Sequence, residues 1–223
     1  MIVIFDLDDT LYNEMDYVQS GFLATAEYIE KNFGFSSSKS LDVMNEILTK
    51  EGRGKVFDRL LERYRIFSIP LVEECVHVYR YHVPSITPFP IAVELLETLE
   101  EPKYLVTDGH VDVQQSKIDA LGIKKHFKKI FITYRYGVNY AKPSTLCFKK
   151  IKELERCDWS DLLYIADDPT KDFVNLKPLG VHTIRVLTGG HKAVQVDERF
   201  NAEYIIQDLT ELRKILARFN EQY

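Results

Sequence analysis

The 223-residue sequence has few cysteines, and they lack the patterns that give cysteine a structural or metal-binding role. Cys75, Cys147 and Cys157 are odd in number and do not show metal-ligand spacing. This argues against a disulfide framework and against a zinc site. We therefore expect small buried side chains in a reducing, cytoplasmic environment.

The sequence also lacks an excess of positive charge and a long apolar run. Its 29 Lys and Arg residues stand against 34 Asp and Glu residues, which gives a net charge of −5. We expect no nucleic-acid partner, because binding to a phosphate backbone depends on positive charge. No run approaches the roughly 20 apolar residues that cross a bilayer, so we expect no membrane partner. The apolar start at residues 2–5 is interrupted by Asp6 and Asp8, which argues against a signal peptide.

Apolar periodicity divides the chain into an all-helical segment and a segment where strands and helices alternate. Residues 2–5 predict a buried strand. Helices are expected over 16–33, 41–50, 56–65 and after Pro70, with no strand between 14 and 82. Three prolines then mark an extended connection at 84–90. Beyond it we expect strands at 104–106, 129–133, 162–166 and 182–186, and helices at 91–99, 111–121, 144–154, 170–176 and 209–219.

Short apolar strands that alternate with helices are typical of a parallel sheet with helices on both faces. The sequence therefore predicts an α/β fold whose core is a doubly wound, Rossmann-like parallel sheet. The helical block is an insertion after the first strand. We expect a core domain of residues 1–13 and 87–223 and a helical domain of residues 14–86.

Polar side chains follow three of the predicted strands. Asp6 and Asp8 follow the first, Thr107 the second, and Asp167 the fourth. In such sheets, ligands bind beyond the carboxyl ends of the strands, near the point where the strand order reverses. Acids gathered there repel one another unless a cation neutralises them. Oxygen ligands without thiolates or paired histidines favour Mg²⁺ over zinc.

Four motifs in register make the chain resemble the haloacid dehalogenase-like superfamily of hydrolases. Residues 5–11, FDLDDTL, resemble the first motif, in which two aspartates flank one residue and a threonine follows. Thr107 after an apolar strand resembles the second, and Lys142 in AKPS resembles the third. Residues 166–172, ADDPTKD, resemble the fourth, with Ala166 where many members carry glycine. Any one of these motifs is weak by itself, but all four occur in the right order at predicted strand ends.

The first motif suits covalent phosphoryl transfer. A carboxylate displaces an alkoxide from a phosphate monoester only if the phosphoryl charge is screened and the leaving group is protonated. Asp6 would be the nucleophile and form an aspartyl-phosphate. Asp8 would protonate the departing oxygen and then take a proton from the hydrolytic water.

The resemblance implies a Mg²⁺ site and acidic residues that support it. The ion would be held by the Asp6 side chain, the Asp8 backbone carbonyl and the Asp167 side chain. Asp172 would orient a metal-bound water or the lysine of the third motif, with Asp168 sharing part of that role. A purely structural role is the alternative for Asp168.

The resemblance also implies a phosphate-binding set. Thr107 would donate its hydroxyl to a phosphoryl oxygen, helped by backbone N–H groups around Asp108 and Gly109. Lys142 would screen both the phosphate and the nucleophile. The glycine-rich residues 188–192 lack the spacing of a nucleotide-phosphate loop and are expected to form a plain turn.

The insertion at 14–86 lies where one subfamily of this superfamily, subfamily I, carries a helical C1-type cap, which implies a bundle that closes over the site. The leading hypothesis is a Mg²⁺-dependent phosphatase whose partner is a small phosphorylated metabolite, such as a sugar phosphate or a nucleotide. Asp8 disfavours a dehalogenase, because a halide needs no acid in order to leave. A phosphomutase, or a non-catalytic binding member of the same fold, remains an alternative.

Overall fold

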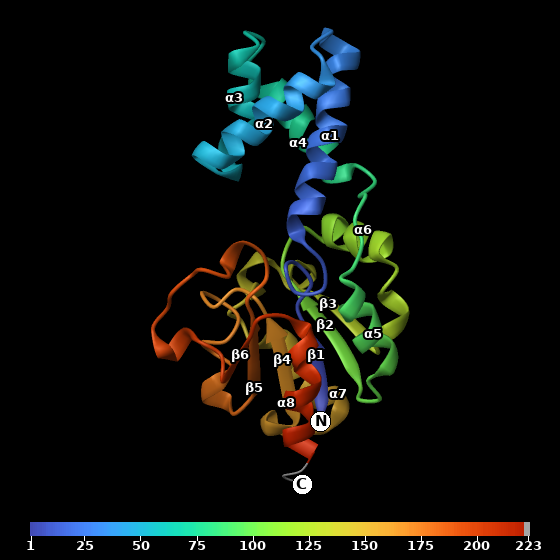
Figure 1. The fold of residues 1–223 in the computed structure, drawn as a ribbon, viewed down its shortest axis with the longest axis vertical. Coiled ribbons are helices and arrows are strands. Elements are labelled where there is room, and N and C mark those ends of the chain that lie inside the picture. The colour runs from blue at the N-terminus through green and yellow to red at the C-terminus, as the bar shows by residue number, and fades with distance from the viewer. Residues whose placement is uncertain (221–223) are drawn as a thin grey trace. The chain divides into compact units, whose positions relative to one another are not determined.

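The structure is a computed structural model that describes residues 1–220, and the side chains of residues 1–219. The chain divides into two compact units (Figure 1). One is an α/β unit of Met1–Glu14 and Thr87–Tyr223. The other is a helical unit of Met15–Ile86.

The α/β unit contains six parallel strands in the order β3-β2-β1-β4-β5-β6. These are β1 (Ile2–Phe5), β2 (Lys103–Thr107), β3 (Lys129–Ile132), β4 (Leu162–Ala166), β5 (His182–Val186) and β6 (Tyr204–Ile206). β1 pairs with β2 on one side and with β4 on the other. This confirms the doubly wound parallel sheet and places the reversal of strand order beside β1.

Helices pack on both faces of this sheet. They are α5 (Pro90–Thr98), α6 (Val111–Leu121), α7 (Leu146–Glu155) and α8 (Leu212–Asn220). Successive side chains of a strand point to opposite faces. One face therefore carries Ile4 and Tyr164, which belong to the same buried cluster as Phe148 and Ile151 of α7.

One expectation for the α/β unit was wrong, and one strand was missed. Residues 170–176 form successive turns instead of a helix. The Asp168 side chain accepts from the backbone N–H of Thr170, and Asp172 accepts from the N–H of Asp168. Such side-chain bonds compete with helical ones. The three-residue strand β6, which extends the sheet beyond β5, was not expected from its short pattern.

The helical unit is built on four helices, as the sequence predicts. They are α1 (Glu14–Phe33), α2 (Ser37–Glu51), α3 (Val56–Arg63) and α4 (Ile69–Tyr81). Phe22 of α1, Met44 of α2 and Leu60 of α3 meet in one buried cluster, and Cys75 of α4 lies in a second. Ser36 caps α2 by accepting from the N–H of Lys39.

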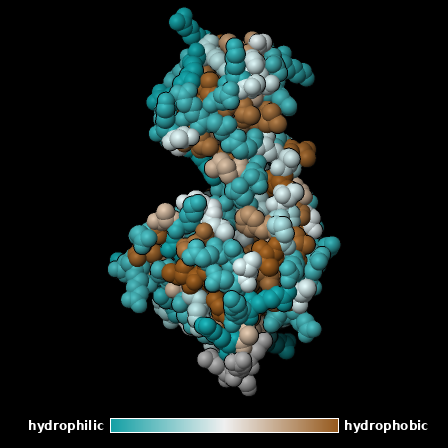
Figure 2. Space-filling model, in the orientation of Figure 1, coloured by the Kyte–Doolittle hydropathy of each residue, from teal (hydrophilic) through white to brown (hydrophobic). Residues whose placement is uncertain are grey.

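The three cysteines are free, with Cys75 and Cys147 buried and Cys157 partly buried. On the face displayed in Figure 2, hydrophobic residues lie scattered between hydrophilic ones, which is ordinary for a protein surface. Within residues 1–220, no helix has the length and apolar character that crossing a membrane requires.

The packing of α7 yields a stability prediction. Phe148→Ala should lower the free energy of unfolding by about 3–5 kcal/mol, because it removes a fully buried ring from the cluster under the sheet. Leu154→Ala on the same helix should change it by less than about 0.5 kcal/mol, since Leu154 is 52% exposed. Urea denaturation of both variants tests this, and equal losses would contradict the assignment of the buried face.

Candidate active site

A small pocket of about 140 Å³ lies at the carboxyl ends of β1, β2 and β4, where the strand order reverses. Its lining comes from segments far apart in the sequence: Asp6, Asp8, Asp9, Glu14, Thr107, Asp108, Lys142, Asp167, Lys171 and His191. Every lining residue belongs to the α/β unit. The pocket is therefore formed within a single unit.

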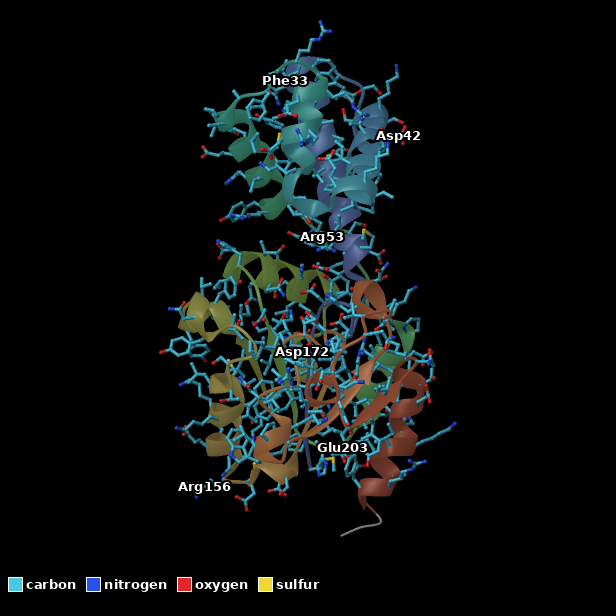
Figure 3. All side chains as sticks on the ribbon, turned by 90° about the vertical axis from the view of Figure 1, so that its left-hand side faces the viewer. Phe33, Asp42, Arg53, Arg156, Asp172 and Glu203 are labelled. Carbon is cyan, nitrogen blue, oxygen red and sulfur yellow. The ribbon has the colours of Figure 1, made fainter. Side chains whose placement is uncertain are left out.

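Lys142 links the residue after β1 to the loop after β4. Its Nζ lies 2.9 Å from Asp6 Oδ1 and 2.8 Å from Asp172 Oδ1. It also donates to the hydroxyl of Tyr164, which in turn donates to Asp172. Although burial favours the neutral amine, the two carboxylates outweigh it and raise the pKa of Lys142. Lys142 is therefore charged beside Asp6, while Asp172 lies in the interior of the unit (Figure 3).

Three buried carboxylates gather around this lysine. One oxygen each of Asp6, Asp167 and Asp172 lies within 4.8 Å of the others. Burial raises the pKa of Asp6 to about 7, and burial together with Asp6 and Asp172 raises the pKa of Asp167 to about 9. Three acids share one fully buried lysine, so a divalent cation would relieve their repulsion. Hard oxygen donors in this arrangement fit Mg²⁺.

The Asp8 side chain is held by α6 and by a neighbouring tyrosine. Lys117 Nζ lies 2.7 Å from Asp8 Oδ1, Gln114 Nε2 donates to Oδ2 at 2.8 Å, and the Tyr12 hydroxyl donates to Oδ1. Burial opposes ionisation of Asp8, but these three donors, with Lys117 foremost, lower its pKa. In this arrangement Asp8 is a carboxylate.

Thr107 at the end of β2 and the two residues that follow it make different contacts. Thr107 is fully buried, and its Oγ1 accepts a hydrogen bond from Gln114. Asp108 Oδ1 accepts from the Thr133 hydroxyl and from the backbone N–H of Lys142, so it fixes the backbone of that lysine. Gly109 has a φ of +134°, a conformation that favours glycine.

The loop after β4 is ordered by its own acids. Asp168 Oδ1 accepts from the Thr170 N–H and hydroxyl. Its other oxygen lies 3.6 Å from Lys171 Nζ. Of the residues predicted for the site, Asp168, Asp172 and Gly109 do not line the pocket. Asp172 and Asp168 each lie close to a lysine that does line it, Lys142 and Lys171 respectively.

Residues 188–192 were expected to form a plain turn, and Gly189–His191 do form a single 3₁₀ turn, but His191 also lines the pocket, which was not expected. Gly190 N–H donates to Asp9 Oδ2 at 2.9 Å, and the Thr188 hydroxyl donates to the Asp9 carbonyl. His191 Nδ1 thereby lies 2.8 Å from Asp167 Oδ2. Arg185 of β5 holds the loop from below by donating to the His191 carbonyl.

Sequence reasoning also missed four polar residues that surround the predicted ones: Gln114, Lys117, Tyr164 and Lys171. Gln114 and Lys117 are three residues apart on α6, a spacing that places them on one face of a helix. That spacing was the available signal, but it does not say which face docks on the sheet.

Comparison with known proteins gives consistent matches over nearly the whole chain. The profile of the haloacid dehalogenase-like hydrolase family matches residues 3–186. A glyceraldehyde 3-phosphate phosphatase from Methanocaldococcus jannaschii is 28% identical, with 98% of each chain covered. One from Pyrococcus furiosus is 27% identical, with 98% of this chain and 94% of that protein covered. The crystal structure of the HAD-hydrolase YfnB from Bacillus subtilis, bound to magnesium, shares the fold with a TM-score of 0.67 at 18% identity, covering 96% of this chain and 97% of that one.

The loop contact at Asp9 yields a second stability prediction. Gly180 and Gly189 both have positive φ, but a Cβ on Gly189 would lie 1.9 Å from Asp9 Cγ, whereas one on Gly180 meets nothing within 4 Å. Gly180→Ala should cost about 1–2 kcal/mol from backbone strain alone. Gly189→Ala should cost at least about 1 kcal/mol more, because Asp9 must move and lose its bond to Gly190. Urea denaturation of both variants measures the difference, and equal costs would contradict the contact.

The acid cluster yields a prediction on metal and pH. A carboxyl whose pKa is raised stabilises the metal-free fold at low pH and loses that contribution as the pH rises through the raised pKa. Protons and metal compete for the same oxygens, so the increase in Tm caused by Mg²⁺ should be larger at pH 8 than at pH 6. At a hundredfold excess over its Kd, the ion should add about 2.7 kcal/mol.

A control variant distinguishes Mg²⁺ binding at the acid cluster from Mg²⁺ binding at the protein surface. Asp167→Asn should abolish most of the Mg²⁺ effect on Tm, whereas Asp42→Asn, on the exposed surface of α2, should retain it (Figure 3). An Asp167→Asn protein that Mg²⁺ stabilises as strongly as the parent would place the ion elsewhere.

Proposed function

This chain belongs to the haloacid dehalogenase-like hydrolase family, and from that premise we propose that it is a Mg²⁺-dependent phosphatase of a small phosphorylated metabolite. The observation that carries the proposal is the Asp6 carboxylate, buried beside the charged Lys142 and close to Asp167. A nucleophilic carboxylate next to a fixed cation suits attack on a dianionic phosphoryl group.

In the proposed reaction, a carboxylate oxygen of Asp6 attacks phosphorus and forms an aspartyl-phosphate as the alkoxide leaves. Lys142 keeps its charge because the carboxylates of Asp172 and Asp6 favour the charged form against the effect of burial. Asp172 and Tyr164 also hold its Nζ beside the nucleophile. Thr107 donates its hydroxyl to a phosphoryl oxygen. Backbone N–H groups around Asp108 and Gly109 would bind the same phosphoryl group.

Asp8 would transfer the protons in both half-reactions. Held as a carboxylate by Lys117, Tyr12 and Gln114, it is in the form that accepts a proton from the hydrolytic water. To protonate the leaving oxygen in the first half-reaction, it must first take up a proton. Bound phosphate brings negative charge into the pocket and favours that protonated form.

The donor set of the pocket is compatible with Mg²⁺ held by the Asp6 and Asp167 carboxylates and the Asp8 backbone carbonyl. When bound, the ion would supply positive charge to the phosphoryl oxygens. Asp172 would act by holding Lys142, and Asp168 would act by fixing the backbone of the loop after β4.

The substrate class is proposed from the relatives and from the small pocket. Two relatives that align over almost the entire chain are glyceraldehyde 3-phosphate phosphatases, so we would test triose phosphates first among the sugar phosphates. The pocket volume of about 140 Å³ suits a phosphoryl group more than a whole metabolite. We infer that the helical residues 14–86 act as the cap that selects the leaving group.

The test is phosphate release from triose, pentose and hexose phosphates, nucleotides and an aryl phosphate, with and without Mg²⁺. The parent should release phosphate only with the metal. Asp6→Asn should lower kcat by at least about a thousandfold, because the amide is not a nucleophile. Asp42→Asn, the same change on an exposed helix, should behave as the parent.

Release that survives Asp6→Asn would refute the covalent mechanism. Transfer of phosphate to a second hydroxyl, with no free phosphate, would identify a phosphomutase. Binding of substrates without any turnover would identify a non-catalytic member.

A further inference from the structure

One amide group connects two of the proposed functional residues. Gln114 is buried on α6, and its Nε2 lies 2.8 Å from Asp8 Oδ2 and 2.6 Å from Thr107 Oγ1. Asp8 follows β1 and Thr107 ends β2, so a single side chain from the following helix spans both strand ends. Neither contact was expected from the motifs.

The chemistry of the partners fixes which way this amide faces. The Gln114 amide nitrogen is the atom that faces both partners, since Nε2 donates to Asp8 Oδ2 and lies within hydrogen-bond distance of Thr107 Oγ1. That nitrogen has two protons, and the second one reaches Thr107 Oγ1. The threonine oxygen therefore accepts from Gln114, and its own proton is left to donate to another acceptor.

The backbone after β2 is shaped to admit this side chain. A Cβ on Gly109 would lie 3.2 Å from both Cγ and Cδ of Gln114, and the φ of +134° already favours glycine there. Lys117, three residues further along α6, holds the other oxygen of Asp8. Gln114 is thus packed on one side and hydrogen-bonded on the other, with little freedom to turn.

We propose that Gln114 is a positioning residue that directs the Thr107 hydroxyl proton toward the phosphoryl group of the substrate. The inference rests on the proposed phosphatase function and adds a residue to it. Gln114 itself acts through Thr107 and Asp8. Its contribution is the direction of a hydrogen bond: an acceptor in its place would turn the Thr107 donor away from the phosphate.

Gln114→Glu replaces the hydrogen-bond donor by an acceptor with almost no change in the shape of the side chain. A carboxylate oxygen against Thr107 Oγ1 would accept the hydroxyl proton, so the hydroxyl could no longer donate to phosphate. The Kd of inorganic phosphate, measured by calorimetry in Mg²⁺, should rise about tenfold or more. Gln115→Glu is the matched control, because this neighbour on α6 bonds Asp119 and Arg135 instead. Its phosphate Kd should stay within about twofold of the parent value.

A new carboxylate near the pocket also repels phosphate, and a double-mutant cycle separates this repulsion from the effect through Thr107. In a Thr107→Val background no hydroxyl remains to be turned. If Gln114 acts through Thr107, Gln114→Glu should then change the phosphate Kd by less than about threefold. If repulsion alone operates, the change should be the same in both backgrounds, which would overturn the inference.

The outcomes distinguish this inference from the proposed function. A parent that releases phosphate while the two changes are additive refutes the role of Gln114 alone. A parent that releases no phosphate from any substrate refutes both. Should Gln114→Glu fail to fold by circular dichroism, Gln114→Leu enters the same cycle, and its effect should likewise depend on the Thr107 hydroxyl.

Discussion

The site depends on one electrostatic constraint: three carboxylates and one lysine are buried together at the point where the strand order reverses. Burying unpaired charge is costly, so the surrounding residues neutralise, hydrogen-bond or space these groups. Tyr164 bonds both Lys142 and Asp172, and His191 approaches Asp167 from the opposite loop. Polar side chains from several strands and loops of the α/β unit therefore bond to this cluster.

The same constraint explains why the two aspartates of the first motif differ in acidity. Burial, with Asp172 nearby, raises the pKa of Asp6 although Lys142 opposes the shift, whereas Lys117 and the other donors around Asp8 outweigh its burial and lower its pKa. The pKa values of two identical groups, two residues apart, are thus shifted in opposite directions. Pairs of this kind are the usual basis for separating a nucleophile from an acid–base group.

The sheet and the motif positions could be predicted because they depend on local patterns. Short apolar strands such as residues 162–166, followed at once by aspartates, fix both the fold class and the edge where the acids meet. The contacts of Gln114 could not be found in this way, because they depend on how α6 docks. Residues 170–176 were misassigned as a helix, since the bonds of Asp168 and Asp172 override the helical pattern. Gly190 in the loop at 188–192 bonds Asp9, which is 181 positions away in the sequence, and no local signal encodes that contact.

Because Asp9 contacts the loop after β5, the residue that position 189 can carry depends on the residue at position 9. Asp9 adopts a φ of +54°, and its carboxylate occupies the space that a side chain at position 189 would need. The positive φ at position 189 favours glycine whatever stands at position 9, and an acid at position 9 adds a steric demand for it. Over evolutionary time a side chain should therefore appear at position 189 only after position 9 has changed to a smaller residue, and in protein engineering position 189 cannot be varied while Asp9 is kept.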